Sequence, residues 1–207
     1  MFIRYLWLDP RFFAAAIFLV VFSICCHEFM HALTALKFGD DTAARHGHLT
    51  LNPLKQMGWL SIVMLLFLGI AWGQVPVTPS NFRSRGERVL TSLAGPLTNL
   101  ALWLIFAAIS FVCFRMNGNK NFAGNMLAYG SIMNFALFVL NLLPVPGLDG
   151  FNVLYEFFPG FFRRDSEVIK GAFFILIALL LAFSERLFDL ARIATTLILI
   201  GMDKVIP

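Results

Sequence analysis

Long runs of hydrophobic residues, separated by short polar segments, dominate the chain. Three nearly uncharged runs cover roughly residues 11–37, 89–114 and 125–143. A helix needs about 20 apolar residues to cross about 30 Å of hydrocarbon, so each run predicts a transmembrane helix. The apolar run 171–183 predicts a further span, and 186–206 has the mixed pattern of an amphipathic or interfacial helix.

The segment between the first two spans follows a different pattern. Residues 42–53 alternate polar and apolar positions around Gly47, which predicts a short extended segment or hairpin. Residues 57–72 are apolar but few, and Gly73 and Pro76 follow them. Length alone leaves both a crossing and a re-entrant or interfacial piece open for 57–72.

These patterns predict an all-α integral membrane protein, a polytopic bundle of about four to six transmembrane helices with a short membrane-associated hairpin or re-entrant segment after the first helix. We expect one membrane-embedded domain over 1–207, with a core at about 11–150 and C-terminal helices at about 167–206. The composition agrees, because 59% hydrophobic and 14% charged residues are unsuited to a soluble domain. The net charge of +4 is dispersed and forms no basic groove, so no nucleic-acid partner is expected.

A His-Glu-x-x-His sequence, His27 to His31, lies inside the first apolar run. On a helix, positions i and i+4 share a face, so both imidazoles can bind one zinc ion while Glu28 acts as general base. The alternative is that these residues only form hydrogen bonds between helices. Each ionisable group inside a membrane costs on the order of 2 to 3 kcal/mol or more, and a bound cation is the simplest compensation.

A third ligand must come from elsewhere in the chain, and Asp149 is the best candidate. It follows an apolar run and a break at Pro144 and Pro146, and it precedes Gly150. An opened helix there would turn the carboxylate into the bundle. The same residues also suit an ordinary turn at the membrane surface, so the residues alone leave both readings open.

Three motifs, 27–31, 94–99 (Ala-Gly-Pro-Leu-Thr-Asn) and 141–150 (Asn-Leu-Leu-Pro-Val-Pro-Gly-Leu-Asp-Gly), occur in this order, and 47–53 fits between the first two. Together they resemble the site-2 protease family of intramembrane zinc metalloproteases, in particular its compact prokaryotic members without PDZ or CBS domains. The resemblance covers most of the first 150 residues.

The resemblance implies one Zn²⁺ ion held by His27, His31 and Asp149, with Glu28 as the catalytic glutamate. Zinc would polarise the substrate carbonyl and activate water, and Glu28 would pass the proton to the leaving amine. The expected substrate is a transmembrane segment of another membrane protein, as in regulated intramembrane proteolysis. Further expected partners are the lipid bilayer and either a regulatory membrane protein or a second copy of the chain.

Two asparagines are candidates for binding substrate or stabilising an oxyanion. Asn141 precedes the aspartate motif, and Asn99 ends the second motif. The alternative for Asn141 is a hydrogen bond between helices. The alternative for Asn99 is a packing role: Gly95 and Asn99, one helical turn apart, would only permit close packing of the second span against the first.

The positions of the motifs constrain the topology. His27 lies in the C-terminal half of its span and Asp149 lies just past the end of its own, so the two spans must run parallel. We therefore expect that 57–72 does not cross. Lys and Arg are then more numerous on the active-site side, which predicts that the site lies nearer the cytoplasm and the N-terminus outside. The resemblance to compact prokaryotic members implies a prokaryotic cytoplasmic membrane.

Two other functions are open to a helical bundle with these residues. A catalytically silent scaffold would bind helices without cutting them, but it has no need of Glu28. A metal or proton transporter would place His27, His31 and Asp149 on an ion path, but the chain lacks the repeated halves of many transporters. We therefore expect a protease.

Overall fold

The computed structural model describes residues 2–118, 121–159 and 166–205, with the side chains of 166–170 and 172–184 left outside the description. Every regular element in these residues is helical, and no strand occurs among them. The prediction of an all-α protein is therefore confirmed.

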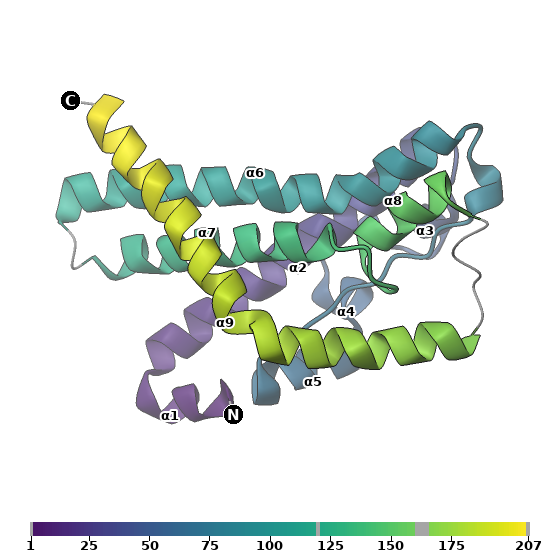
Figure 1. The fold of residues 1–207 in the computed structure, drawn as a ribbon. Helices are drawn as coiled ribbons and strands as arrows, with labels where there is room; N and C mark the ends of the chain where they lie inside the picture. Colours follow the sequence, from purple (N-terminus) through teal and green to yellow (C-terminus); the bar gives the residue numbers. More distant parts are fainter. Residues whose placement is uncertain (1, 119–120, 160–165, 206–207) are drawn as a thin grey trace.

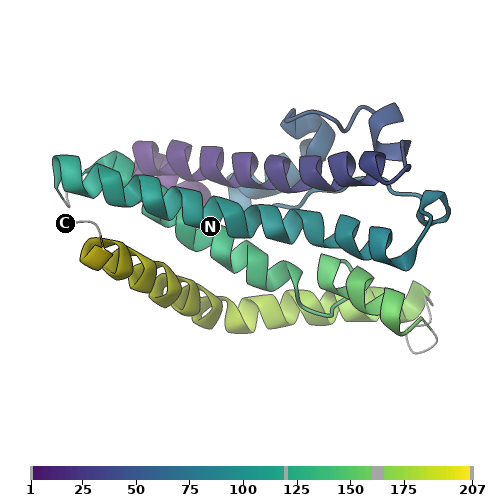
Figure 2. The same ribbon diagram turned by 90° about the horizontal axis from the view of Figure 1, so that it is seen from above.

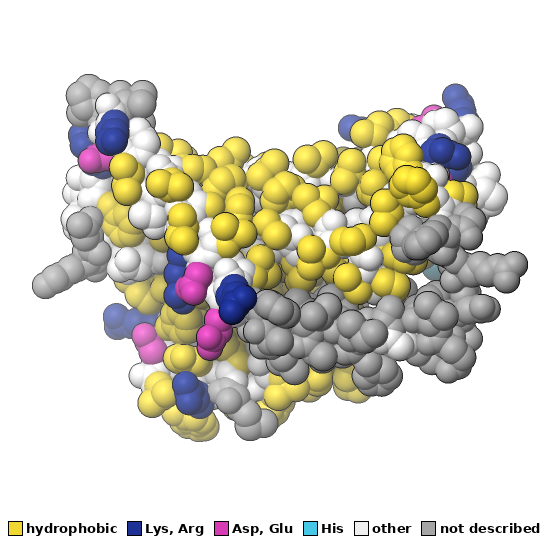
Figure 3. Space-filling model, viewed as in Figure 1, with side chains coloured by type: hydrophobic (Ala, Val, Ile, Leu, Met, Phe, Trp, Pro, Cys, Tyr) yellow, Lys and Arg dark blue, Asp and Glu magenta, His cyan; other side chains and the backbone are white. Residues whose placement is uncertain are grey.

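Three long helices form the body of the molecule: α2 (Pro10–Lys37), α6 (Arg85–Asn117) and α7 (Phe122–Asn141). All three are long and apolar enough to cross a membrane, as predicted. They lie side by side in both ribbon views, with α6 against α2 and α7 (Figures 1 and 2). Figure 3 shows a band of hydrophobic side chains across the upper part of one face, with Lys and Arg at both ends of the band and a further group of charged side chains below it.

Side-chain caps mark where α2 and α6 begin. A short turn, η1 (Phe2–Arg4) with α1 (Tyr5–Leu8), precedes α2. The Asp9 side chain accepts a hydrogen bond from Phe12 N at 3.0 Å and so caps α2. Ser84 and Glu87 form a capping box at the start of α6.

Short helices connect α2 to α6: α3 (Thr42–Arg45), α4 (Pro53–Gln56), α5 (Gly58–Leu68) and η2 (Pro79–Asn81). The extended segment or hairpin predicted to begin at Thr42 is wrong, because the chain makes a helical turn there instead. An ion pair between Arg45 and Asp41, one helical turn apart, stabilises this turn. The alternation of polar and apolar residues in 42–53, on which the prediction rested, gives no sign of this ion pair.

α5 and the chain that follows it form a hairpin of one helix and one extended arm. α5 has 11 residues, about 16 Å, which is too short to cross a membrane. The arm runs back beside α5, with Trp72 N donating to Ser61 Oγ at 2.9 Å. Thr78 N then donates to Asp40 Oδ2 at 2.8 Å, so the arm returns to the C-terminal end of α2.

The C-terminal part consists of α8 (Asp149–Phe157) and α9 (Ser166–Val205). The prediction of separate helices at 171–183 and 186–206 is wrong, since α9 is one helix that changes direction partway (Figure 1). No proline interrupts 166–205, so the polar residues between the two apolar runs do not break the backbone. Trp103 Nε1 of α6 donates to Thr195 Oγ1 of α9 at 3.0 Å.

Candidate metal centre

The His-Glu-x-x-His residues lie in the C-terminal half of α2. His27, Glu28 and His31 are all buried, each less than a tenth exposed. Both histidines face α6 and the start of α8, because i and i+4 lie on the same side of a helix. Asp149 is the first residue of α8 and follows the proline-containing break after α7.

The structure brings the three predicted ligands together. His27 Nε2 lies 3.0 Å from Asp149 Oδ2, and His31 Nε2 lies 3.3 Å from Asp149 Oδ1. The two Nε2 atoms are 3.0 Å apart. One candidate ligand atom from each residue falls within 4.8 Å of the others. The open helix end at Asp149 therefore turns the carboxylate into the bundle, and the surface-turn alternative does not hold.

The partners of Nδ1 determine how each imidazole is protonated. His27 Nδ1 lies 2.6 Å from Asn99 Oδ1, and His31 Nδ1 lies 2.7 Å from the Thr91 carbonyl oxygen. Both oxygens can only accept, so both Nδ1 atoms donate their proton. In the neutral rings the lone pairs are then on Nε2, and both point at the carboxylate of Asp149.

The orientation of the Asn99 amide is fixed by a second asparagine. Asn134 Nδ2 donates to the Gly130 carbonyl at 2.8 Å and to Ser23 Oγ at 2.9 Å, which leaves its Oδ1 facing Asn99. Asn99 Nδ2 donates to that oxygen at 3.0 Å. Asn99 Oδ1 must therefore face His27. Asn99 and Asn134 are both fully buried, so no water replaces these bonds.

This arrangement fits a bound metal ion. When both imidazoles are neutral, their Nε2 lone pairs and the carboxylate of Asp149 face one another with no proton between them. Asp149 Oδ2 is buried and has no hydrogen-bond partner within the described part of the chain, although His27 Nε2 is close. A cation would satisfy all three groups at once. Two imidazoles and one carboxylate, with a position left for water, are a donor set typical of catalytic zinc.

The Asp149 carboxyl is held in its charged form. Burial alone would raise its pKa. When the imidazoles are protonated and no metal is bound, the positive charge on His31 and hydrogen bonds from His27 and His31 outweigh burial and hold the pKa of Asp149 well below its usual value. A position in the first turn of α8 also favours negative charge. Arg88 Nε pairs with Glu156 Oε2 at 2.8 Å and so fastens α8 to α6.

Two glycines let backbone approach the site closely. A Cβ atom at Gly95 of α6 would overlap the imidazole rings of His27 and His31. A Cβ atom at Gly73, in the arm after α5, would overlap the carboxylate of Glu28. Only glycine fits at either position without displacing a site residue.

The two candidate asparagines differ in what they contact. Asn99 contacts His27, and its predicted role toward substrate or an oxyanion stays a prediction. Asn141 Nδ2 donates to the Leu137 carbonyl of its own helix at 3.1 Å, and its predicted role stays a prediction. Thr91, Asn134 and Gly73 were not singled out from the sequence, and the position of Asn134 in the middle of the apolar run of α7 was the available signal for it.

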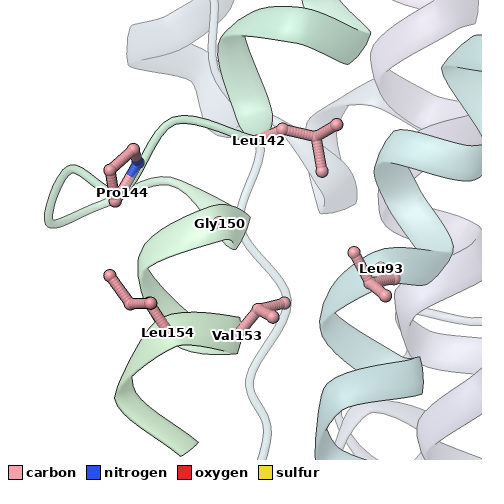
Figure 4. A pocket seen from close by; sticks show the side chains of 6 residues that line it. All are labelled: Leu93, Leu142, Pro144, Gly150, Val153 and Leu154. Carbon is pink, nitrogen blue, oxygen red and sulfur yellow. The ribbon is translucent and has the colours of Figure 1, made fainter. Parts of the chain in front are cut away.

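A cavity of about 310 Å³ lies between α6, α8 and the break after α7 (Figure 4). It is lined by Leu93, Leu142, Pro144, Gly150, Val153 and Leu154. None of these side chains can titrate or bind a metal, so the candidate metal ligands on α2 and α8 are not part of the lining of this cavity.

A helical bundle with transmembrane-length helices and a buried His-His-Asp cluster on a His-Glu-x-x-His helix defines a membrane metalloprotease. The model of Peptidase family M50 matches residues 116–183, which include Asp149. The chain belongs to this family of zinc metalloproteases. No solved structure shows significant similarity to the chain.

Three relatives illustrate the similarity. "Putative zinc metalloprotease YwhC" of Bacillus subtilis is 33% identical over 184 residues, 86% of this chain and 84% of the relative. "Putative zinc metalloprotease Rip2" of Mycobacterium tuberculosis is 38% identical over 138 residues, 64% of this chain and 52% of the relative. "Putative zinc metalloprotease MJ0611" of Methanocaldococcus jannaschii is 28% identical over 135 residues, 62% of each chain.

Proposed function

We propose that this chain is an intramembrane zinc endopeptidase that hydrolyses peptide bonds within or near transmembrane segments of other membrane proteins. The observation that carries the proposal is the cluster of His27, His31 and Asp149 inside a bundle of helices long enough to span a membrane. A site at this depth is best reached by a helix that enters from the bilayer.

His27, His31 and Asp149 would hold the zinc ion. Bound there, zinc supplies Lewis acidity, which polarises the scissile carbonyl and makes water nucleophilic near neutral pH. Glu28 would take a proton from the attacking water and deliver it to the leaving amine. Asn99 and Thr91 hold the imidazoles in the metal-binding tautomer, and Asp149 stays charged.

The substrate must be partly unwound before it can be cut. Carbonyl groups in a helix are already hydrogen-bonded and covered by side chains, so glycine or proline near the cut would favour cleavage. We propose a regulatory membrane protein or a second copy of the chain as the additional partner.

The arrangement in the membrane is part of the proposal. α2, α6 and α7 would cross, with part of α9 as a further span of a bundle of about four to six helices. The hairpin containing α5 would enter and leave on one side. Lys37, Lys55, Arg83 and Arg85 are exposed near that end. The positive-inside rule then favours the cytoplasmic side of a prokaryotic cytoplasmic membrane.

The test is cleavage of a panel of helix-destabilised transmembrane substrates by the purified full chain in liposomes. We expect Glu28→Gln to abolish cleavage while it keeps about one zinc per chain. Asp41→Asn, a similar change at an exposed carboxylate that pairs only with Arg45 among described residues, should cleave like the wild type. Cleavage retained in Glu28→Gln would refute the role of Glu28. A wild type that binds no zinc under zinc-replete conditions would refute the mechanism and favour the scaffold.

A further inference from the structure

A second buried carboxylate, Asp40, lies outside the metal centre. It follows the C-terminal end of α2 and is fully buried. Its Oδ1 accepts from Thr42 N at 3.1 Å, from Thr42 Oγ1 at 2.5 Å and from Asn81 Nδ2 at 2.8 Å. Its Oδ2 accepts from Thr78 N at 2.8 Å. Burial would raise the pKa of Asp40, but these hydrogen bonds outweigh burial and lower it, so the carboxyl is charged at neutral pH.

Two of these bonds reach far along the chain. Thr78 and Asn81 belong to the segment that returns from α5, 38 and 41 residues after Asp40. Hydrogen bonds to a charged acceptor are about twice as strong as those between neutral groups. Asp40 therefore ties this returning segment firmly to the end of α2.

The returning segment also reaches Glu28. We define the strap as residues 72–78, which has no regular secondary structure. Ser61 Oγ holds its first residue, with 2.7 Å to the Trp72 carbonyl and 2.9 Å to Trp72 N. Gln74 N donates to the Gln56 carbonyl at 3.0 Å. Gly73, between these two anchors, is where the strap lies against the Glu28 carboxylate.

The two ends of the strap are thus held by different elements. α4 and α5 hold the end next to Glu28, through Gln56 and Ser61, and Asp40 holds the other end. Glu28 and Asp40 are themselves on or just after α2, twelve residues or about 18 Å apart, so they do not touch. Besides α2 itself, the strap is the segment that joins Asp40 to Glu28.

We propose that Asp40 is a positioning residue of the peptidase reaction, which holds the strap so that Gly73 confines the carboxylate of the general base Glu28. The inference rests on the proposed role of Glu28. Release of the far end lets the strap move away, and Glu28 then samples orientations that do not face the attacking water. A displacement of about 1 Å at a reacting group can cost on the order of a hundredfold in rate.

The experiment compares the full-length wild type with Asp40→Asn, Asp41→Asn and Gly73→Ala, and with the double variant Asp40→Asn/Gly73→Ala. In Asp40→Asn one oxygen becomes an amide nitrogen and loses its donors. We expect kcat to fall about tenfold or more with KM and zinc content within about twofold of wild type. Asp41→Asn, the matched control, should leave kcat unchanged.

The double variant separates positioning from a general structural effect. Gly73→Ala already displaces Glu28, so adding Asp40→Asn should lower kcat little further if both act through the strap. Hydrogen exchange of the amides in 72–78 should rise in Asp40→Asn. Unchanged kcat in a folded Asp40→Asn, or losses that multiply in the double variant, would overturn the proposal.

The experiment also covers two complications, a variant that does not fold and a wild type that cuts no substrate. Should Asp40→Asn not fold, Asn81→Ala removes one of the two long-range donors, and a fall in kcat of about threefold with faster exchange in the strap is expected. An unchanged rate and unchanged exchange in Asn81→Ala would overturn the proposal. If the wild type binds zinc but cuts no substrate, the proposed function fails, whereas exchange in the strap still decides whether Asp40 anchors it.

Discussion

Replacement of Asn99 by alanine tests the metal centre without touching a ligand. The change removes the acceptor of the His27 Nδ1 proton, which lies 2.6 Å away. Loss of such an outer hydrogen bond weakens metal binding about 10- to 100-fold, or about 1.4 to 2.8 kcal/mol. Asn99 is fully buried, so water does not replace the lost bond, and Asn134 loses its partner as well. We therefore expect the upper part of this range.

The assay is the zinc dissociation constant of the purified protein, measured by competition with a chromophoric chelator. The matched control is Ser110→Ala, because Ser110 is also fully buried on α6 but bonds the Gly124 carbonyl, far along the helix from the histidines. This control should cost about 1 kcal/mol of stability and leave zinc affinity unchanged. A dissociation constant of Asn99→Ala within twofold of wild type would refute the role of Asn99 in orienting His27 for zinc.

Three further outcomes follow from the same geometry. Gly95→Ala should lower zinc content, because the added Cβ overlaps both imidazoles, even though alanine favours a helix over glycine by about 1 kcal/mol. Zinc content is measured by atomic absorption, and full occupancy in the variant would contradict the overlap. Chelation should lower the Tm reversibly, since free zinc at 100 times its Kd stabilises the folded chain by about 2.7 kcal/mol; an unchanged Tm contradicts a metal that joins α2 to α8. The pKa of Asp40 is below its usual 3.8, so its stabilising charge is present at neutral pH and is lost as pH falls through the lowered pKa. The stability difference between wild type and Asp40→Asn should thus shrink below pH 3.8, as measured by unfolding at several pH values, and a constant difference argues against an ionised Asp40.

The parts predicted correctly from sequence depend on local patterns. Apolar runs of sufficient length specify α2, α6 and α7 almost to their ends, because bilayer thickness fixes how many residues a span needs. The spacing of His27 and His31 specifies a shared face once the run is known to be helical. Asp149 could be proposed because the prolines before it open the chain.

The parts that were wrong or missed depend on contacts between distant segments. The alternation in 42–53 resembles a strand, yet Thr42 bonds Asp40 and the Arg45–Asp41 pair favours a helical turn. The contact of Gly73 with Glu28 joins residues forty-five positions apart, and no local pattern contains it. The same holds for the strap, whose anchors are the side chains of Ser61 and Asp40 and the backbone carbonyl of Gln56.

The buried polar side chains also explain why the metal site and the packing of the helices are inseparable. A series of hydrogen bonds joins Ser23 of α2, Asn134 of α7, Asn99 of α6 and His27 of α2, and it ends at the imidazole of a candidate metal ligand. An unpaired buried polar group costs about 1 to 3 kcal/mol, so a shift of one helix along another would break several bonds at once. This cost favours a single register of α2, α6 and α7. The register that satisfies Asn134 is the one that fixes the tautomer of His27, and the geometry needed to bind zinc is therefore set when the three helices pack.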